Sequence, residues 1–304
     1  MKQIIIGNTF RASQISLGCM RIFSKDKKEV NLLLNEAVSQ NINLFDHADI
    51  YGGGESEKMF AKALPLTPSM RDKILIQTKC GIRDGYYDFS KEHILNSVDG
   101  SLKRLNTEYI DILLLHRPDT LMEPEEVAEA FNILKQSGKV RYFGVSNQNP
   151  MQIELLNEYL EDKILINQLR LSIINSTMID SGFNVNVEND GAVVRDGGIL
   201  EYSRLKKITI QAWSPFIAGF SRKSFINNSD YKELNDLLNE LGQKYNATAE
   251  ALAIAWILRH PANIQPIVGT TQRERLIKIC KACDINLTRE EFYLIYKAAG
   301  KKIP

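Results

Sequence analysis

Four polar side chains end or follow three consecutive apolar runs in the first part of the chain. The runs read LFDHADIYGGG (44–54), ILIQTKCG (74–81) and DILLLHRPD (111–119). The four residues are Asp46, Tyr51, Lys79 and His116. If the runs are parallel strands, all four side chains lie at the same end of the sheet. Enzymes built on barrels of parallel strands carry their catalytic groups at that end.

These residue types together suit proton transfer to an oxygen atom. Tyrosine is a weak acid with an ordinary pKa of about 10, and a nearby ammonium such as Lys79 lowers that pKa. Asp46 can pair with Lys79 and hold it, and His116 is a second donor that could orient a carbonyl. The set could polarise a carbonyl and protonate the oxyanion formed when a hydride arrives.

Taken singly, each of the four residues has a structural explanation. A lone Asp or Lys at a strand end is often a solvated charge or a cap, and a tyrosine before three glycines can anchor a turn. A histidine after an apolar strand is often a core residue. Their joint placement on three successive strands favours the functional interpretation.

Strand-like runs alternate with amphipathic helical stretches along the whole chain. After a hairpin-like start (KQIII, then Gly7-Asn8), strands are expected at 15–19, 44–49, 74–79, 110–116, 142–147, 164–171, 208–215 and 264–270. Helices are expected at 26–41, 56–64, 91–105, 124–137, from Asn149-Pro150, and at 197–207, 230–245, 247–259, 271–283 and 288–300. Eight strand–helix units predict a (β/α)₈ TIM barrel with an N-terminal β-hairpin and extra helices late in the chain.

The alternative fold is a doubly wound open sheet. That fold would carry a glycine fingerprint after its first strand, and ISLGCMRIF lacks one. No low-complexity linker interrupts the chain, so we expect one domain over 1–304. The least regular stretch is 173–198, whose Gly, Asn and Asp content predicts a long loop.

Composition excludes several classes of function. Lys and Arg number 38 and Asp and Glu 37, so the net charge of +1 gives no basic stripe for nucleic acid or an anionic membrane. Apolar runs are too short to span a bilayer. The four cysteines are few for a disulfide framework, and we expect a cytoplasmic protein. No spacing of histidines suggests a metal site, and Cys280-x-x-Cys283 is interpreted as packing.

At these residues the chain resembles the aldo-keto reductase family. FDHADIYGGGESE, TKCG and LLLHRPD are similar to the family's signatures, and GVSN, INQ, AWSP and PIVGTT follow in family order. HADIYGG, KCGI and HRPD are most similar to a branch of bacterial YdhF-like oxidoreductases. The resemblance implies an NADPH-dependent reductase that converts an aldehyde or ketone to an alcohol. Tyr51 would be the general acid, Lys79 and Asp46 would tune it, and His116 would orient the carbonyl.

The resemblance also implies a set of cofactor-binding positions. These are Gly18, Met20, Asp46, Ser146, Asn147, Gln168, Trp213, Ser214, Pro215, Phe216, Gly269, Thr270, Thr271 and Arg275. Among them, Ser146, Asn147 and Gln168 would bind the nicotinamide carboxamide. Trp213 would stack on the nicotinamide where the family usually has tyrosine.

The adenosine 2′-phosphate would bind near Thr270, Thr271 and Arg275. Thr271-x-x-Glu274 predicts a capping box, and hence a helix N-terminus that can bind an anion. Where the family commonly has Lys-Ser, this chain has Gly269-Thr270. Fewer groups are therefore available to bind the 2′-phosphate, and the expected preference for NADPH over NADH is less strict. The short loop after His116 predicts an open substrate site, and the substrate itself is not specified.

Two other functions fit parts of the sequence. Lys79 could form a Schiff base in a barrel aldolase or lyase. Alternatively, the chain could be a regulatory, redox-sensing subunit that binds NADPH with little turnover, as some family members are. The expected partner is a small carbonyl substrate, with no nucleic acid and no membrane.

Overall fold

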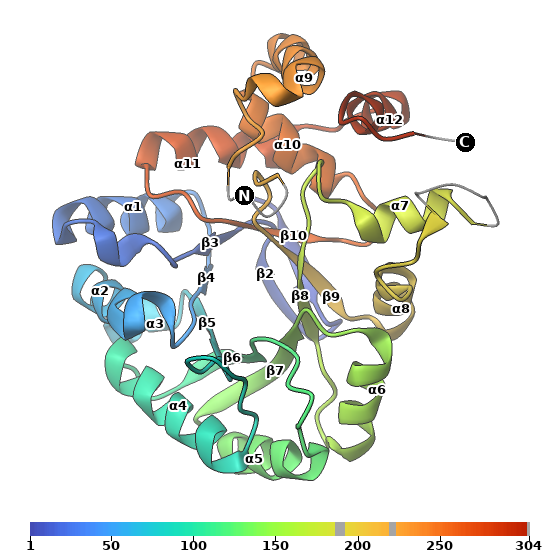
Figure 1. Ribbon diagram of the computed structural model, residues 1–304. Coiled ribbons are helices and arrows are strands. Elements are labelled where there is room, and N and C mark those ends of the chain that lie inside the picture. The colour runs from blue at the N-terminus through green and yellow to red at the C-terminus, as the bar shows by residue number, and fades with distance from the viewer. Residues whose placement is uncertain (186–191, 219–222, 303–304) are drawn as a thin grey trace.

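The computed structural model describes residues 1–185, 192–218 and 223–302. Its centre is a closed barrel of eight parallel strands in the order β10-β3-β4-β5-β6-β7-β8-β9 (Figure 1). The strands are β3 (Ser16–Gly18), β4 (Leu44–Asp46), β5 (Leu75–Cys80), β6 (Ile110–Leu115), β7 (Val140–Ser146), β8 (Ile166–Arg170), β9 (Thr209–Trp213) and β10 (Gln265–Val268). The predicted barrel is confirmed, and closure excludes the open sheet.

The predicted N-terminal hairpin is confirmed as well. β1 (Gln3–Ile6) pairs antiparallel with β2 (Phe10–Ser13). The turn between them places Gly7 and Asn8 at φ 52° and 57°, a region that these two residue types tolerate best. Ile6 and Ala12 pack with interior residues of the barrel strands, so the hairpin seals the N-terminal end of the barrel.

A ring of helices surrounds the strands (Figure 1). They are α1 (Lys27–Ser39), α2 (Glu55–Ala63), α3 (Pro68–Arg71), α4 (Lys91–Leu105), α5 (Pro124–Gln136), α6 (Pro150–Tyr159), α7 (Thr177–Phe183), α8 (Ile199–Lys206), α9 (Lys232–Tyr245), α10 (Ala249–Leu258), α11 (Arg273–Cys280) and α12 (Arg289–Ala298). Short 3₁₀ turns are η1 (Ile22–Ser24), η2 (Tyr51–Gly54), η4 (Ser229–Tyr231) and η5 (Lys281–Asp284). Asn149 caps α6 with Pro150 at its first position, as predicted.

The extra helices occur where the sequence predicted them. α10 is buried along nearly its whole length, because it lies between β10 and the outer helices α9 and α12 (Figure 1). The indole of Trp256 stacks on Phe292 of α12 at 4.8 Å between ring centroids. This contact holds the last helix against the barrel wall.

Two expectations about irregular and helical stretches were wrong in part. The stretch 173–198 is not a continuous loop, because its first part forms α7 with Met178 and Ile179 buried. Residues 186–191 of that stretch lie outside the described residues. The helix expected over 271–283 begins at Arg273 and ends at Cys280, and a 3₁₀ turn follows.

Side-chain alternation along the strands decides what lies inside the barrel. Leu44, Ile112, Leu114 and Ile166 fill the interior near the hairpin. Residues two positions further along a strand face the same way, so Asp46 follows Leu44 and Gln168 follows Ile166 into the barrel. The interior therefore changes from apolar to polar toward the C-terminal ends of the strands. Among the described residues, no helix is long and apolar enough to cross a membrane.

Candidate active site

The four residues of the opening motif lie at the C-terminal mouth of the barrel. Asp46 ends β4, Lys79 lies one residue before the end of β5, and His116 follows β6 directly. Tyr51 begins the turn η2 after β4. Parallel strands bring their C-terminal ends to one edge, and this places the four side chains together.

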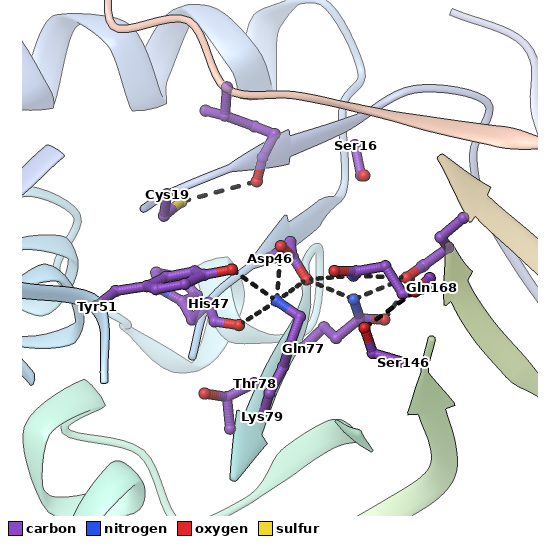
Figure 2. Close-up of polar contacts among 12 residues, drawn as sticks. Ser16, Cys19, Asp46, His47, Tyr51, Gln77, Thr78, Lys79, Ser146 and Gln168 are labelled. Atoms are coloured by element: carbon purple, nitrogen blue, oxygen red, sulfur yellow. Dashed lines mark hydrogen bonds and ion pairs between the residues drawn. The ribbon is translucent and has the colours of Figure 1, made fainter. Parts of the chain in front are cut away.

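Lys79 is the centre of the cluster (Figure 2). Its Nζ lies 2.8 Å from Asp46 Oδ1 and 2.9 Å from Asp46 Oδ2. The same ammonium donates to the backbone oxygen of His47 at 2.6 Å and to Tyr51 Oη at 3.2 Å. Lys79 is fully buried, so these contacts replace its hydration. The Tyr51 hydroxyl is thereby held beside a fixed positive charge.

A glycine turn fixes the position of Tyr51. Gly52 and Gly54 have φ of 61° and 92°, and a Cβ would lie 2.8 Å from the Phe23 ring or 2.7 Å from Arg104 Cδ, respectively. Gly52 and Gly54 are therefore closely packed, whereas a Cβ at Gly53 would meet nothing within 4 Å. Glycine is required at positions 52 and 54 because both the backbone angles and the neighbours exclude a side chain.

Burial dominates the ionisation of Tyr51. It raises the pKa of the Tyr51 phenol, and the opposing effect of the Lys79 ammonium only partly offsets it. Lys79 acts on this pKa in the expected direction, but burial outweighs it, so the Tyr51 pKa is raised on balance. Burial disfavours the ammonium of Lys79, but Asp46 and Tyr51 outweigh it and raise the Lys79 pKa. The resting pair is a neutral phenol beside a charged ammonium.

His116 faces the edge of the Tyr51 ring. The two ring centroids lie 6.0 Å apart at an interplanar angle of 81°. Burial, then the charges of Lys79 and Arg117, hold the His116 pKa well below its usual range. The imidazole is therefore neutral, with one N–H to donate. Its Nδ1 is buried without a hydrogen-bond partner among the described residues.

The residues expected to bind the nicotinamide form a linked group at the ends of β7, β8 and β9. Asn147 Nδ2 donates to Ser146 Oγ at 2.7 Å, and Ser146 Oγ donates to the backbone oxygen of Gln168 at 2.9 Å. Trp213 Nε1 donates to Asn147 Oδ1 at 3.2 Å. The indole and the amide therefore hold each other at the rim, and the structure brings together all four of these predicted residues.

Two arginines beside Trp213 were not anticipated from the sequence. The guanidinium carbons of Arg117 and Arg170 each lie 5.5 Å from the centroid of the Trp213 ring. Arg170 and Trp213 are paired at the ends of β8 and β9. Burial, then the charge of Arg117, lowers the pKa of Arg170. The rim of the barrel is thus more positive than the net charge of the chain suggests.

The loop after β9 approaches the start of α11. Ser214 has φ 53°, and Ile217 N donates to its backbone oxygen at 3.1 Å, which turns the chain back over Pro215. Phe216 is buried, and the Arg275 guanidinium carbon lies 5.3 Å from its ring centroid. The loop residue and the predicted phosphate ligand are therefore in contact before any cofactor binds.

The remaining predicted cofactor residues lie at the ends of β3 and β10. Gly18 ends β3, and Met20 is exposed just beyond it. Arg21, which the sequence reasoning missed, donates to the backbone oxygen of Gly269 at 2.6 Å and bridges the two loops. Arg21 lies three residues after Gly18, in the loop at the C-terminal end of a barrel strand, and this position could have marked it as a candidate site residue.

The predicted capping box at Thr271 and Glu274 is wrong. The N-cap of α11 is Gln272, and its side chain makes no capping hydrogen bond. The backbone N–H of Gln272 donates to the hydroxyl of Thr270 at 3.1 Å, and not to the hydroxyl of Thr271. The helix begins one residue later than the motif implied, because the hydroxyl of the earlier threonine, Thr270, forms the turn. Among the residues that the structure describes, no side chain caps the first-turn N–H groups of α11.

These features fit a dinucleotide phosphate. The uncapped N-terminus of α11 can accept an anion, and Arg275 lies within the same turn. At the other end, Trp213 offers an aromatic face, and Ser146, Asn147 and Gln168 offer polar groups for a carboxamide. NADPH would bind with its nicotinamide at the mouth and its 2′-phosphate near Arg275.

Interior glutamines are the main group that the sequence reasoning overlooked. Gln77, Gln211 and Gln265 are fully buried inside the barrel. A sequence signal existed, because Gln77 stands two residues before Lys79 and Gln211 two before Trp213. A period of two places each glutamine on the inward face, below a residue of the mouth.

The comparisons with known proteins agree with this geometry. Residues 14–299 match the aldo/keto reductase family. The chain belongs to this family. It is accordingly an NAD(P)H-dependent oxidoreductase. The oxidoreductase YdhF of Escherichia coli is 33% identical, over 96% of this chain and 95% of its own.

Further relatives cover the chain completely. The uncharacterised oxidoreductase YcsN of Bacillus subtilis is 38% identical, over 100% of both chains. A 6-dehydroglucose reductase of Agrobacterium fabrum is 32% identical over the same coverage. Among solved structures, the thermostable aldo-keto reductase Tm1743 superimposes with a TM-score of 0.79 at 26% identity, over 98% of this chain and 100% of its own.

Metal and thiol chemistry finds no support in the described part of the chain. No group of three or more His, Cys, Asp or Glu there could hold a metal ion. Cys280 and Cys283 are buried free thiols, and burial raises their pKa values to about 12 and about 11. Both therefore stay protonated, which agrees with their interpretation as packing residues.

Proposed function

We propose that the chain reduces an aldehyde or ketone to an alcohol with NADPH, and that Tyr51 is the general acid. The observation that carries the proposal is the contact of Lys79 Nζ with both Asp46 and Tyr51 Oη. This arrangement gives one hydroxyl a proton to donate and a fixed cation beside it. The bound cofactor supplies the hydride to the carbonyl carbon.

The roles of the four residues follow from their charges. Tyr51 is a phenol at neutral pH, because the ordinary pKa of tyrosine is about 10 and burial raises it further, so the proton is present before the reaction. The carbonyl oxygen receives this proton as it becomes negative. Tyr51 is then a phenolate, which the Lys79 ammonium stabilises at 3.2 Å. The cation therefore contributes more to the transition state than to the resting enzyme.

His116 and Asp46 have positioning roles in this proposal. A neutral His116 can donate its N–H to the carbonyl oxygen and orient it toward Tyr51. Asp46 neutralises Lys79 and keeps it in place. Ser146, Asn147, Gln168 and Trp213 would hold the nicotinamide ring so that one face meets the substrate. Gly18, Met20, Gly269, Thr270, Thr271 and Arg275 would hold the phosphates, together with the 214–216 loop.

Tyr51→Phe tests the proposal. The variant removes only the proton donor, so kcat for aldehyde reduction should fall about a thousandfold. NADPH binding, followed by cofactor fluorescence, should stay within about twofold, since Tyr51 makes no cofactor contact in the proposal. NADPH oxidation would be measured with a panel of aldehydes, ketones and sugar aldehydes, including 6-dehydroglucose, and repeated with NADH. Unchanged turnover in Tyr51→Phe would refute the mechanism.

The alternatives have distinct outcomes in the same assays. A covalent adduct at Lys79, trapped by borohydride with a carbonyl compound, would support a Schiff-base enzyme instead. Tight NADPH binding with no turnover across the panel would support a regulatory subunit. The expected cytoplasmic location stays a prediction.

A further inference from the structure

We propose that Gln77 and Gln211, buried in the barrel interior, are positioning residues for the Asp46 carboxylate and for the Gln168 amide. This role rests on the proposed function, because it concerns the residues that hold Lys79 and the nicotinamide. Both glutamines are fully buried below the catalytic cluster, so they would act through Asp46 and Gln168 and not directly on a ligand. Figure 2 shows Gln77 and Gln168 converging on Asp46 from the side opposite Tyr51.

The carboxylate of Asp46 receives two amide donors as well as the ammonium. Gln77 Nε2 donates to Asp46 Oδ1 at 2.5 Å, and Gln168 Nε2 donates to the same oxygen at 3.0 Å. Lys79 Nζ lies 2.8 Å from this oxygen too. A buried carboxylate needs such donors, because no water replaces them. The two amides therefore fix the plane of the carboxylate, and the carboxylate fixes Lys79.

Gln211 sets the direction of both amides. Its Oε1 accepts from Gln77 Nε2 at 2.8 Å and from Gln168 Nε2 at 3.1 Å. Its Nε2 donates in return to Gln77 Oε1 at 3.1 Å. Because one carbonyl oxygen collects a hydrogen from each neighbour, the remaining hydrogens of Gln77 and Gln168 point at Asp46.

The direction of Gln211 is itself fixed from the floor of the barrel. Gln265 Nε2 donates to the backbone oxygen of Ser13 at 2.6 Å, in the N-terminal hairpin. A backbone oxygen can only accept, so Gln265 must turn its own oxygen upward. That oxygen accepts from Gln211 Nε2 at 2.9 Å. One chain of hydrogen bonds, with a single possible polarity, thus runs from the hairpin to Asp46.

This series of hydrogen bonds also determines which atom of the Gln168 amide faces a ligand. Both hydrogens of its amide are used, one on Asp46 and one on Gln211. Within the part of the chain that the structure describes, its Oε1 accepts no hydrogen bond. The geometry therefore presents an acceptor to the cofactor, which suits the NH₂ of the nicotinamide carboxamide. A flipped Gln168 would lose two buried hydrogen bonds.

A pair of variants separates positioning from simple core stability. Gln77→Met removes one donor from Asp46 and leaves Gln211 with unpaired groups, so it should lose stability as well as activity. Gln77→Met with Gln211→Met removes the mutual hydrogen bonds of the two glutamines together, so its loss of stability should be smaller than the sum of the losses in the two single variants. It still costs stability, because Asp46, Gln168 and Gln265 each lose a partner. If the glutamines only support folding, kcat per folded molecule, measured well below the unfolding temperature, should equal that of the wild type.

Thr78→Val is the matched control. Thr78 lies next to Gln77 on β5, faces away from the barrel axis, and donates to Glu57 Oε1 at 2.7 Å. This variant also loses one buried hydrogen bond of the same strand. We expect it to be less stable with kcat unchanged. A fall in both quantities would show that any buried defect in β5 lowers activity, and would overturn the specific role of Gln77.

The readouts are kcat, the KM for NADPH and the deuterium isotope effect on kcat, measured with NADPH deuterated at the transferred position. Both glutamine variants should lose about tenfold in kcat, because Lys79 and Tyr51 are displaced by fractions of an ångström. Their isotope effect should exceed that of the wild type. The KM for NADPH should change by less than about twofold in Gln77→Met, which leaves Gln211 to orient Gln168, and should rise more in the double variant, which removes Gln211. A double variant with wild-type kcat and isotope effect would overturn the inference. Absence of turnover in the wild type would instead overturn the proposed function.

Discussion

The catalytic side of the barrel mouth and its phosphate side differ in how their charges are held. On the catalytic side, Lys79 already contacts Asp46 and Tyr51. On the phosphate side, the arginines are paired with carboxylates of neighbouring helices. Arg275 Nε lies 3.4 Å from Glu250 Oε1, and Arg273 Nε lies 2.7 Å from Glu36 Oε2. The catalytic groups therefore already have the contacts that the proposed reaction needs. The arginines on the phosphate side must instead exchange their carboxylate partners for a phosphate when one binds.

The difference follows from the elements that carry each region. Lys79 and Asp46 extend from strands whose directions the closed barrel fixes. Arg275 extends from the first turn of a helix and is about one-third exposed, and its ion pair of 3.4 Å is longer and less buried than the 2.8 Å pair of Lys79, so it is weaker. A weak pair can be exchanged for a phosphate at little cost, while a buried pair cannot be broken cheaply. Four measurements test this contrast.

Lys79→Met should have the largest effect, because it breaks the buried side. It leaves Asp46 as an unpaired buried charge, so we expect a loss of about 3 kcal/mol in the free energy of unfolding. Turnover should fall about a thousandfold. Chemical denaturation and NADPH oxidation measure the two effects. The control is Lys58→Met, whose pair with Glu55 is about half exposed and should change stability by less than about 0.5 kcal/mol.

Arg275→Ala should affect the phosphate side alone. Loss of a charged hydrogen bond to the 2′-phosphate of about 2 kcal/mol corresponds to a roughly thirtyfold weaker Kd for NADPH. The Kd for NADH, which lacks this phosphate, should change by less than about twofold. Cofactor titration with both dinucleotides measures the ratio. An equal loss for the two would remove Arg275 from the proposed site.

Asp49→Asn tests the cost of a buried carboxyl beside the catalytic side, because Asp49 lies between Asp46 and Tyr51 and its backbone N–H donates to the Lys79 backbone oxygen at 3.0 Å. Burial, then the charge of Glu57, raises the pKa of Asp49 to about 7, so the fold favours its protonated form. Unfolded chains ionise this group near pH 4, hence stability from this residue is full below that pH and declines as pH rises to about 7. The asparagine variant should be about 1 kcal/mol more stable than wild type at pH 8. Near pH 4 that advantage should vanish, and denaturant midpoints at both pH values would show it.

Glu250→Gln should give the smallest change and the opposite sign. It frees Arg275 from its carboxylate partner, so NADPH should bind about threefold more tightly at low ionic strength. The gain should shrink in high salt, since screening already weakens the pair. Weaker NADPH binding in this variant would show that Glu250 positions Arg275 instead of competing for it.

Much of this molecule followed from local sequence pattern. Eight strand–helix repeats predict a barrel, because parallel strands need crossover connections. Asp46, Lys79 and His116 could be predicted as site residues because they lie at or just after the ends of the expected strands. The helix start at Asn149 followed from its capping residues. The α11 start did not, because two adjacent threonines compete for the same turn and tertiary contacts select between them.

What only the tertiary structure decided is the state of the buried groups. The sequence placed Tyr51 near Lys79, but the depth of burial determines that the Tyr51 pKa is raised on balance and not lowered. Likewise, the sequence does not show which glutamines in the apolar strands contact one another. Closure of the barrel brings Gln77, Gln168 and Gln211 together. Periodicity fixes which way a side chain faces, whereas hydration and partners across the barrel depend on strands more than a hundred residues apart. For this reason the site's residues could be predicted from the sequence, and their protonation and polarity could not.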